Sequence, residues 1–70
     1  MNIYNASDYG KAIRKRRKEL GYTQSEVCRI SGLSVSFLSD LENGKKTIEL
    51  EKALLVANLL GADIEFENRR

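Results

Sequence analysis

Apolar residues recur along the chain at intervals of three and four, which is the spacing of one face of an α-helix. The first such segment is predicted to begin at Ser7, whose hydroxyl can accept a hydrogen bond from a free N–H of the first turn. Tyr9, Ile13 and Leu20 then fall on one side. Gly21 is a natural left-handed terminator, so we expect the first helix to lie between Ser7 and Gly21.

A second, shorter helix is predicted directly after Thr23. Thr23 and Glu26 stand three residues apart just before an apolar residue, which is a capping-box pattern. Val27 and Ile30 are expected to point inward. Gly32 stands only eight positions after Gln24, so this helix is expected to have only about two turns.

A third and a fourth helix follow. Ser34 can cap the third, which is expected to run to about Glu42 and to end at Asn43-Gly44. Its inward side chains are Phe37, Leu38 and Leu41. The fourth is predicted over residues 49–60, closed by Gly61. Its wide apolar face comprises Leu50, Leu54, Val56, Ala57, Leu59 and Leu60.

The tail changes period after Gly61. Residues 62–67 alternate apolar and acidic side chains, which is typical of a half-buried strand. Such a short strand needs a partner, either residues 2–4 or the same segment of a second copy, or both. We therefore expect an all-α fold, a compact four-helix single domain over residues 1–70, with a short C-terminal β-strand at 62–67 used in dimerisation.

Composition narrows the class of protein. The chain has 70 residues, enough for one domain with a small core, and such domains often gain stability by pairing. Its single cysteine, Cys28, fits a reducing compartment. No apolar run approaches a membrane span, and the N-terminus lacks the order of a signal peptide. We expect a cytoplasmic protein that does not bind membranes.

The sequence gives no indication of a catalytic site. Histidine is absent and there is one thiol, so no metal site is expected. The sequence contains no phosphate-cradling glycine loop and no acid pair in a plausible cleft. We therefore expect no enzymatic activity and no cofactor.

The positive charge is unevenly distributed. The net charge is +2, but Lys and Arg outnumber Asp and Glu only in residues 1–46, and the reverse holds in 47–70. The basic run from Lys11 to Lys18 fits either a solvated helix face or charge close to phosphates. We therefore expect a polyanion to bind the N-terminal two-thirds of the chain.

The second and third helices together make a helix-turn-helix pattern. Cys28 supplies the small side chain needed where the two helices cross, and Gly32 tolerates the positive φ of a tight turn. A small and polar set is left facing outward, and it suits entry into a major groove: Ser34, Val35, Ser36, Ser39 and Asp40.

These motifs resemble a known family. The stretches Ile13-x-x-x-Arg17-x-x-Leu20-Gly-Tyr-Thr-Gln24, Gly32-Leu33-Ser34 and Phe37-Leu38-Ser-Asp-Leu41-Glu42-Asn-Gly44 are similar to the phage Cro/C1 (XRE) type of helix-turn-helix domain. Ile3-Tyr4, the stretch 22–27, the four-helix length and the expected strand are most similar to HipB-type antitoxins. The resemblance implies a repressor that binds a palindromic operator as a homodimer, partly through a C-terminal strand. It also implies a HipBA-like type II toxin-antitoxin system that autoregulates its operon and neutralises a HipA-like kinase toxin.

The resemblance also implies roles for individual residues. Ser34, Val35, Ser36 and Asp40 match base-contacting positions, and Ser39 shares their outward face. The expected phosphate contacts are Thr23, Gln24, Asn43, Lys45 and Lys46. The expected structural residues are a buried Arg17–Glu42 salt bridge with Cys28, Gly32, Leu38 and Leu41, and the expected dimer contacts are Ile64 and Phe66.

The chain departs from the family's pattern in two ways. Ser31 stands where many relatives carry an apolar residue, and the third helix lacks the Gln and Arg side chains that read bases most strongly, so specificity is expected to depend partly on DNA shape. Two alternatives stay open: a phage or plasmid repressor of double-stranded DNA without a toxin, and a module that mainly binds protein.

Overall fold

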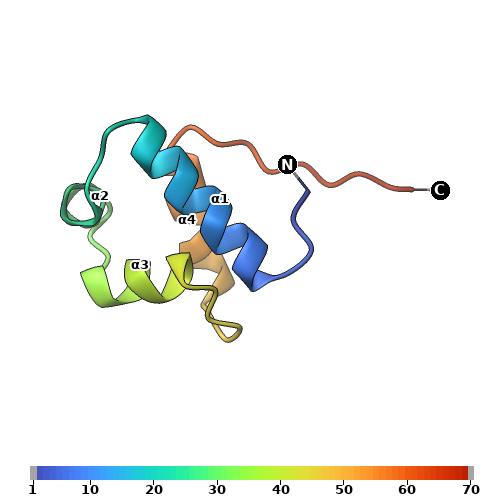
Figure 1. Ribbon diagram of the computed structural model, residues 1–70, viewed down its shortest axis with the longest axis horizontal. Helices are drawn as coiled ribbons and strands as arrows, with labels where there is room; N and C mark the ends of the chain where they lie inside the picture. Colours follow the sequence, from blue (N-terminus) through green and yellow to red (C-terminus); the bar gives the residue numbers. More distant parts are fainter. Residues whose placement is uncertain (1, 70) are drawn as a thin grey trace.

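The computed structural model describes residues 2–69 and contains four α-helices in this range. They are α1 (Ala6–Glu19), α2 (Gln24–Ser31), α3 (Val35–Glu42) and α4 (Leu50–Leu59) (Figure 1). The predicted order of four helices is confirmed. Over the described residues, no helix is long and apolar enough to cross a membrane.

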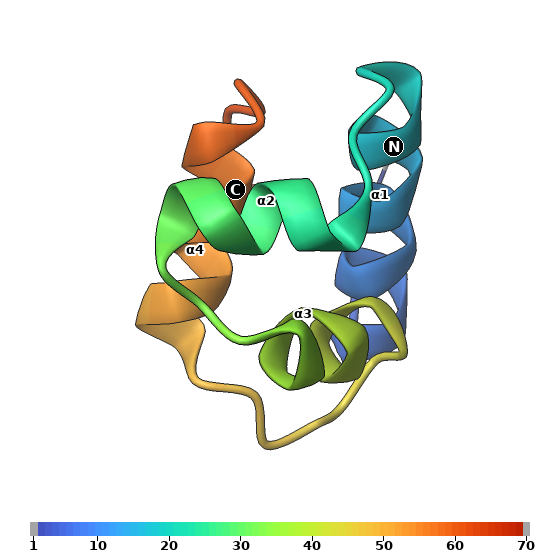
Figure 2. The ribbon, with the colours of Figure 1, turned by 90° about the vertical axis from the view of Figure 1, so that its left-hand side faces the viewer.

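The helices enclose one small core. In Figure 2, α1 and α4 stand on either side, and α2 and α3 cross the space between them. The buried apolar residues come from all four helices and the residue that follows α4: Ile13, Val27, Cys28, Leu38, Leu41, Ala53, Val56, Ala57 and Leu60. Tyr9 and Phe37 are partly buried against this cluster.

The ends of α2 and α3 follow the predicted local chemistry. Thr23 and Glu26 form the capping box, with both reciprocal hydrogen bonds present. Gly32 ends α2 with φ 77°, and the Ser34 side chain accepts a hydrogen bond from the N–H of Phe37 at the start of α3. The short turn between the two helices is therefore specified by these few residues.

The predicted cap of α1 is wrong. The helix begins at Ala6, and the side chain of Asn5 accepts the hydrogen bond from the N–H of Asp8. Ser7 lies inside the first turn, where its backbone approaches Gly44 so closely that a Cβ on that glycine would be 2.8 Å from the Ser7 Cα. Asn5 and Ser7 are both good capping residues, and a contact with a distant loop accompanies the choice between them.

Several apolar side chains predicted to face inward are exposed. Leu20, Ile30, Leu50, Leu54 and Leu59 keep between 40% and 67% of their surface exposed. Helices of 8 to 14 residues meet over short stretches, so their common core has room only for side chains near the crossings. The sequence pattern therefore overestimates the width of each buried face.

The predicted C-terminal strand is also wrong. Within residues 2–69 the segment 62–67 forms no strand, and it leaves the helical body as an extended tail (Figure 1). Ala62 packs against the core, whereas Phe66 is 96% exposed. A strand is stabilised by hydrogen bonds to a neighbouring strand, and residues 2–4 do not form one.

Gly10 marks the closest approach of α1 to α3. A Cβ placed on it would collide with the backbone carbonyl oxygen of Leu41 and lie 2.8 Å from that of Glu42. Because backbone rather than a flexible side chain fills this space, neither helix can yield without moving as a whole. The absent side chain thus sets the distance between the two helices.

Replacing this glycine tests the packing against helix propensity. Propensity alone predicts that Gly10→Ala stabilises α1 by about 1 kcal/mol. We expect instead a destabilisation of about 1–3 kcal/mol because the methyl group overpacks the contact with α3. Urea denaturation measures this, with Lys15→Ala on the exposed side of α1 as a control that changes stability by less than about 0.5 kcal/mol. A Gly10→Ala protein as stable as the wild type would contradict the close approach.

Candidate nucleic-acid interface

The outer side of α3 carries a set of small and polar side chains, which we call the reading face. It consists of Ser34, Val35, Ser36, Ser39 and Asp40. Leu38 and Leu41, on the opposite side of the same helix, are 1% exposed and hold it against the core. The reading face is therefore presented by a helix whose inner side is fully packed.

The side chains of the reading face are not all free. The Ser34 hydroxyl oxygen accepts the cap hydrogen bond from Phe37 at 3.0 Å and keeps its own O–H to donate. The Ser39 hydroxyl accepts from the side-chain amide of Asn43 at 3.4 Å. Val35 and Ser36 are exposed at the first turn of the helix. The N-terminal half of α3 is thus the part most open to a ligand.

Asp40 brings a negative charge to a face expected to meet an anion. Its carboxylate lies 3.5 Å from the ammonium group of Lys45, in the loop that follows α3. Both side chains are about half exposed, so the pair contributes little to stability. Its electrostatic effect is to offset the charge of Asp40 locally.

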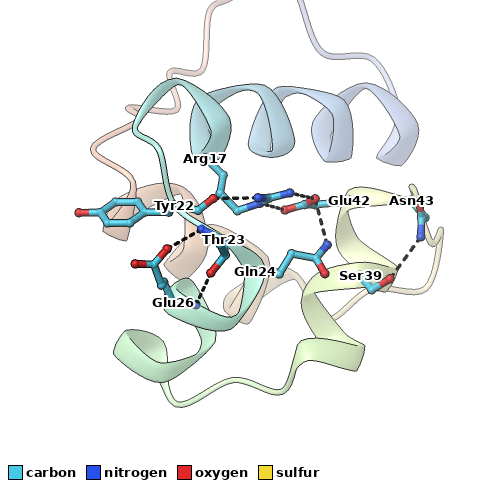
Figure 3. Close-up of polar contacts among 8 residues, drawn as sticks. All are labelled: Arg17, Tyr22, Thr23, Gln24, Glu26, Ser39, Glu42 and Asn43. Carbon is cyan, nitrogen blue, oxygen red and sulfur yellow. Dashed lines mark hydrogen bonds and ion pairs between the residues drawn. The ribbon is translucent and has the colours of Figure 1, made fainter.

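The residues expected to hold phosphates gather where the start of α2 meets the end of α3. Figure 3 shows Gln24 between Thr23 and the Ser39–Asn43 pair. Thr23 is engaged in the capping box, where its hydroxyl oxygen accepts from the N–H of Glu26 at 3.1 Å. Lys45 and Lys46 are exposed in the following loop, so two cationic side chains are accessible close to this edge.

A buried ion pair lies directly beneath this edge. The Arg17 Nε is 2.7 Å from Oε2 of Glu42, and its Nη2 is 2.9 Å from Oε1 (Figure 3). The third nitrogen, Nη1, donates to the carbonyl of Tyr22 at 2.9 Å. Each residue of the pair is 8% exposed. The pair joins α1, the turn before α2 and the end of α3.

The surroundings of Glu42 favour its ionised form. Burial alone would raise the pKa of this carboxyl, but hydrogen bonds from Arg17 and Gln24, together with the charges of Arg17 and Arg14, outweigh burial and lower the pKa. The hydrogen bond to Glu42 correspondingly raises the pKa of Arg17. The ionised carboxylate therefore stabilises the fold above its ordinary pKa of 4.5, and this contribution is lost as the pH falls through the lower folded-state value.

Two polar contacts that the sequence analysis missed hold α1 to α4. The Tyr9 hydroxyl donates to the carbonyl of Ala53, and Arg16 Nε donates to the carbonyl of Leu60 at 2.8 Å. Each joins residues 44 positions apart, so no local sequence pattern could have indicated it. Arg16, one residue of the basic run, therefore has a structural role.

Metal-binding chemistry is not apparent in the described part of the chain. No group of three or more potential ligands among His, Cys, Asp and Glu comes together in residues 2–69. Cys28 is buried in the core, and its burial, followed by the charge of Glu42, raises the pKa of its thiol. A buried thiol of raised pKa is poorly reactive.

The chain is similar to helix-turn-helix proteins over most of its length. A family model described as helix-turn-helix matches residues 13–66. An HTH-type transcriptional regulator of Sinorhizobium fredii, y4mF, is 36% identical over 63 residues, which cover 90% of this chain and 83% of that protein. The ImmF control region 10 kDa protein of Bacillus phage phi105 is 33% identical over 55 residues, covering 79% of this chain and 61% of the phage protein.

Solved structures share the fold at lower sequence identity. A chain in a HipB–O4 20mer complex superposes with a TM-score of 0.89 over 100% of this chain and 99% of its own length, at 21% identity. A chain of a HipA–HipB–O2–O3 complex gives the same TM-score, coverage and identity. At this level of identity the likeness shows that the arrangement of helices is the same.

Removing one side of the ion pair should destabilise the protein strongly. Arg17→Ala leaves a buried carboxylate without its partner, and we expect a loss of about 3–5 kcal/mol in the free energy of unfolding. Arg14→Ala, at an exposed position of the same helix, should cost less than about 1 kcal/mol. Urea denaturation followed by circular dichroism compares the two. Equal losses would show that the pair does not dominate the stability of α1.

Proposed function

Because this chain belongs to the helix-turn-helix family of DNA-binding transcriptional regulators, we propose that it represses transcription by binding a palindromic operator as a homodimer. The observation that carries the proposal is the reading face. A helix packed tightly on one side presents small and polar groups on the other, beside an edge that holds amide, hydroxyl and ammonium donors. This arrangement suits insertion of α3 into a major groove with phosphates on its flank.

The proposed contacts follow from the chemistry of each group. Ser34 and Ser36 can hydrogen-bond base edges, Val35 suits a thymine methyl group, and Asp40 can accept from a cytosine amino group. Ser39 completes the reading face. The proposed phosphate contacts are Thr23, Gln24, Asn43, Lys45 and Lys46. Since the face holds no Arg or Gln, DNA shape supplies part of the specificity.

A second copy is needed for a palindrome, and exposed apolar residues offer a surface for it. An eight-residue helix is about 12 Å long, so one α3 reaches roughly one half-site. On α4, Leu50, Leu54, Leu55 and Leu59 are 39–67% exposed. Together with Ile64 and Phe66 of the tail, these residues are the proposed dimer contacts. Apolar groups in this number on so small a domain mark an interaction surface.

The cellular role proposed first is that of an antitoxin. The fold is shared with chains of a HipB–O4 20mer complex and of a HipA–HipB–O2–O3 complex. We take the chain to be the DNA-binding half of a HipBA-like toxin-antitoxin pair that autoregulates its operon and neutralises a kinase toxin. A phage-type repressor without a toxin is the second candidate, favoured by the 33% identity to the control-region protein of phage phi105.

Co-expression with the neighbouring gene product separates these two roles. An antitoxin should co-purify with a kinase-like protein encoded beside it and suppress its toxicity. The complex should survive Ser36→Ala, which alters only the reading face. Absence of any such neighbour would favour the phage-type role.

Selection from random DNA tests operator binding. Duplexes retained by the protein should converge on a palindrome whose half-sites lie about 34–36 Å apart, one helical turn. The affinity for the selected duplex should fall linearly with salt on a double-logarithmic plot, because Lys and Arg release counterions from phosphates. Gel-shift titrations at several salt concentrations measure both affinity and slope. Retention of all sequences alike would exclude sequence-specific repression.

A substitution that introduces a charge tests the proposed dimer contact on α4. Leu55→Asp should convert the dimer to a monomer in sedimentation velocity and weaken operator binding at least tenfold, with unchanged helical content. Ile30→Asp is the matched control, since Ile30 is an exposed apolar residue on α2. A dimer that persists in Leu55→Asp would place the interface elsewhere.

A further inference from the structure

Gln24 joins the buried ion pair to the surface. It is the first residue of α2, and its Nε2 lies 3.2 Å from Oε1 of Glu42 (Figure 3). That same oxygen accepts from Nη2 of Arg17 at 2.9 Å, and Arg17 holds the other oxygen at 2.7 Å. Gln24 itself is only partly buried, as is its hydrogen bond to Glu42.

The contact with Glu42 fixes which way the amide of Gln24 points. An ionised carboxylate only accepts hydrogen bonds, so the Gln24 nitrogen, and not its carbonyl oxygen, must face Glu42. A side-chain amide has two N–H groups, and this contact uses one of them. The second N–H and the carbonyl oxygen remain for a ligand. The side chain is thereby ordered before any ligand arrives, which lowers the entropy lost on binding.

The charges around this site are compatible with an anion. A lone carboxylate beneath a phosphate contact would repel it, but Glu42 is neutralised by Arg17. Arg14 is also close enough for its charge to act on Glu42. Arg17 and Arg14 thus balance the two carboxylates nearest this end of α2, those of Glu42 and Glu26. The N-terminal end of α2 adds the partial positive charge of its free N–H groups.

From this geometry we propose that Glu42 is a positioning residue for DNA binding, which orients the Gln24 amide so that its free N–H meets a backbone phosphate. The inference rests on the proposed function and deepens it. The buried pair then has two roles: it holds α1 to α3, and it orders a DNA contact on α2. Glu42 touches no DNA itself and acts through Gln24.

A substitution at Gln24 tests the contact while both members of the buried pair, Arg17 and Glu42, are kept. Gln24→Met keeps the length of the side chain and removes both amide functions. On the duplex selected by the wild type, we expect about tenfold weaker binding with an unchanged slope of affinity against salt, because a neutral side chain releases no counterion. Lys46→Ala is the matched control, since loss of a cationic phosphate contact should reduce that slope by about one. Wild-type affinity in Gln24→Met would overturn the proposal.

A double-mutant cycle tests the positioning by Glu42. Glu42→Gln replaces an acceptor-only group with one that also donates, so Gln24 is no longer forced into one orientation. The tenfold effect of Gln24→Met should then shrink to about twofold in the Glu42→Gln background. A purely structural Glu42 would leave the effect at tenfold in both backgrounds, which would contradict the proposal.

Gln24→Asn keeps the test decisive if Glu42→Gln does not fold. Its amide is one methylene shorter, so it cannot span from Glu42 to a phosphate, and it should bind as weakly as Gln24→Met. Full binding by Gln24→Asn would show that no positioning is needed. Failure of the proposed function looks different, because the wild type itself would then prefer no duplex over random DNA.

Discussion

The ion pair between Arg17 and Glu42 is the interaction on which the rest of the domain depends. Taking two charges out of water is costly, and the cost is offset only when every donor and acceptor finds a partner. Here all three guanidinium nitrogens are hydrogen-bonded, and both carboxylate oxygens accept. Within residues 2–69 no buried side-chain nitrogen or oxygen lacks a partner. In the same range the core contains nine buried apolar residues, so the margin of stability is small and this fully hydrogen-bonded pair matters for how α1 and α3 are held together.

Most of the helical architecture could be predicted because its signals are local. The capping box at Thr23, the positive φ of Gly32 and the cap at Ser34 depend on a few neighbouring residues, and the structure has all three. The errors have different causes. The cap of α1 is Asn5 rather than Ser7, and it is held by two local hydrogen bonds, from the N–H of Asp8 to Asn5 and from the N–H of Tyr4 to the Asp8 carboxylate. The alternating pattern of residues 62–67 specifies which side chains share a face, but a strand also needs a neighbour.

Prediction of the candidate site from the sequence also succeeded only in part. The family resemblance pointed to Arg17 and Glu42 as partners across 25 positions, which no local pattern could do. It gave no sign of Gly10, whose importance comes from two carbonyl groups of α3, nor of the link from Gln24 to Glu42. These features depend on the distance between packed helices. The roles of the exposed residues on α3 remain predictions, because bases and phosphates, rather than the chain itself, define them.

The exposed tail allows changes in pairing to be separated from changes in folding stability. Residues 63–69 are all exposed, so substitutions there leave the packing of the four helices untouched. Mutations on the tail therefore escape the stability threshold that constrains the core. A duplicated copy of this chain could therefore acquire a different pairing partner through residues 63–69 while its four helices and its reading face stay the same. The tail thus gives the fold a region in which binding preferences can diverge without loss of stability.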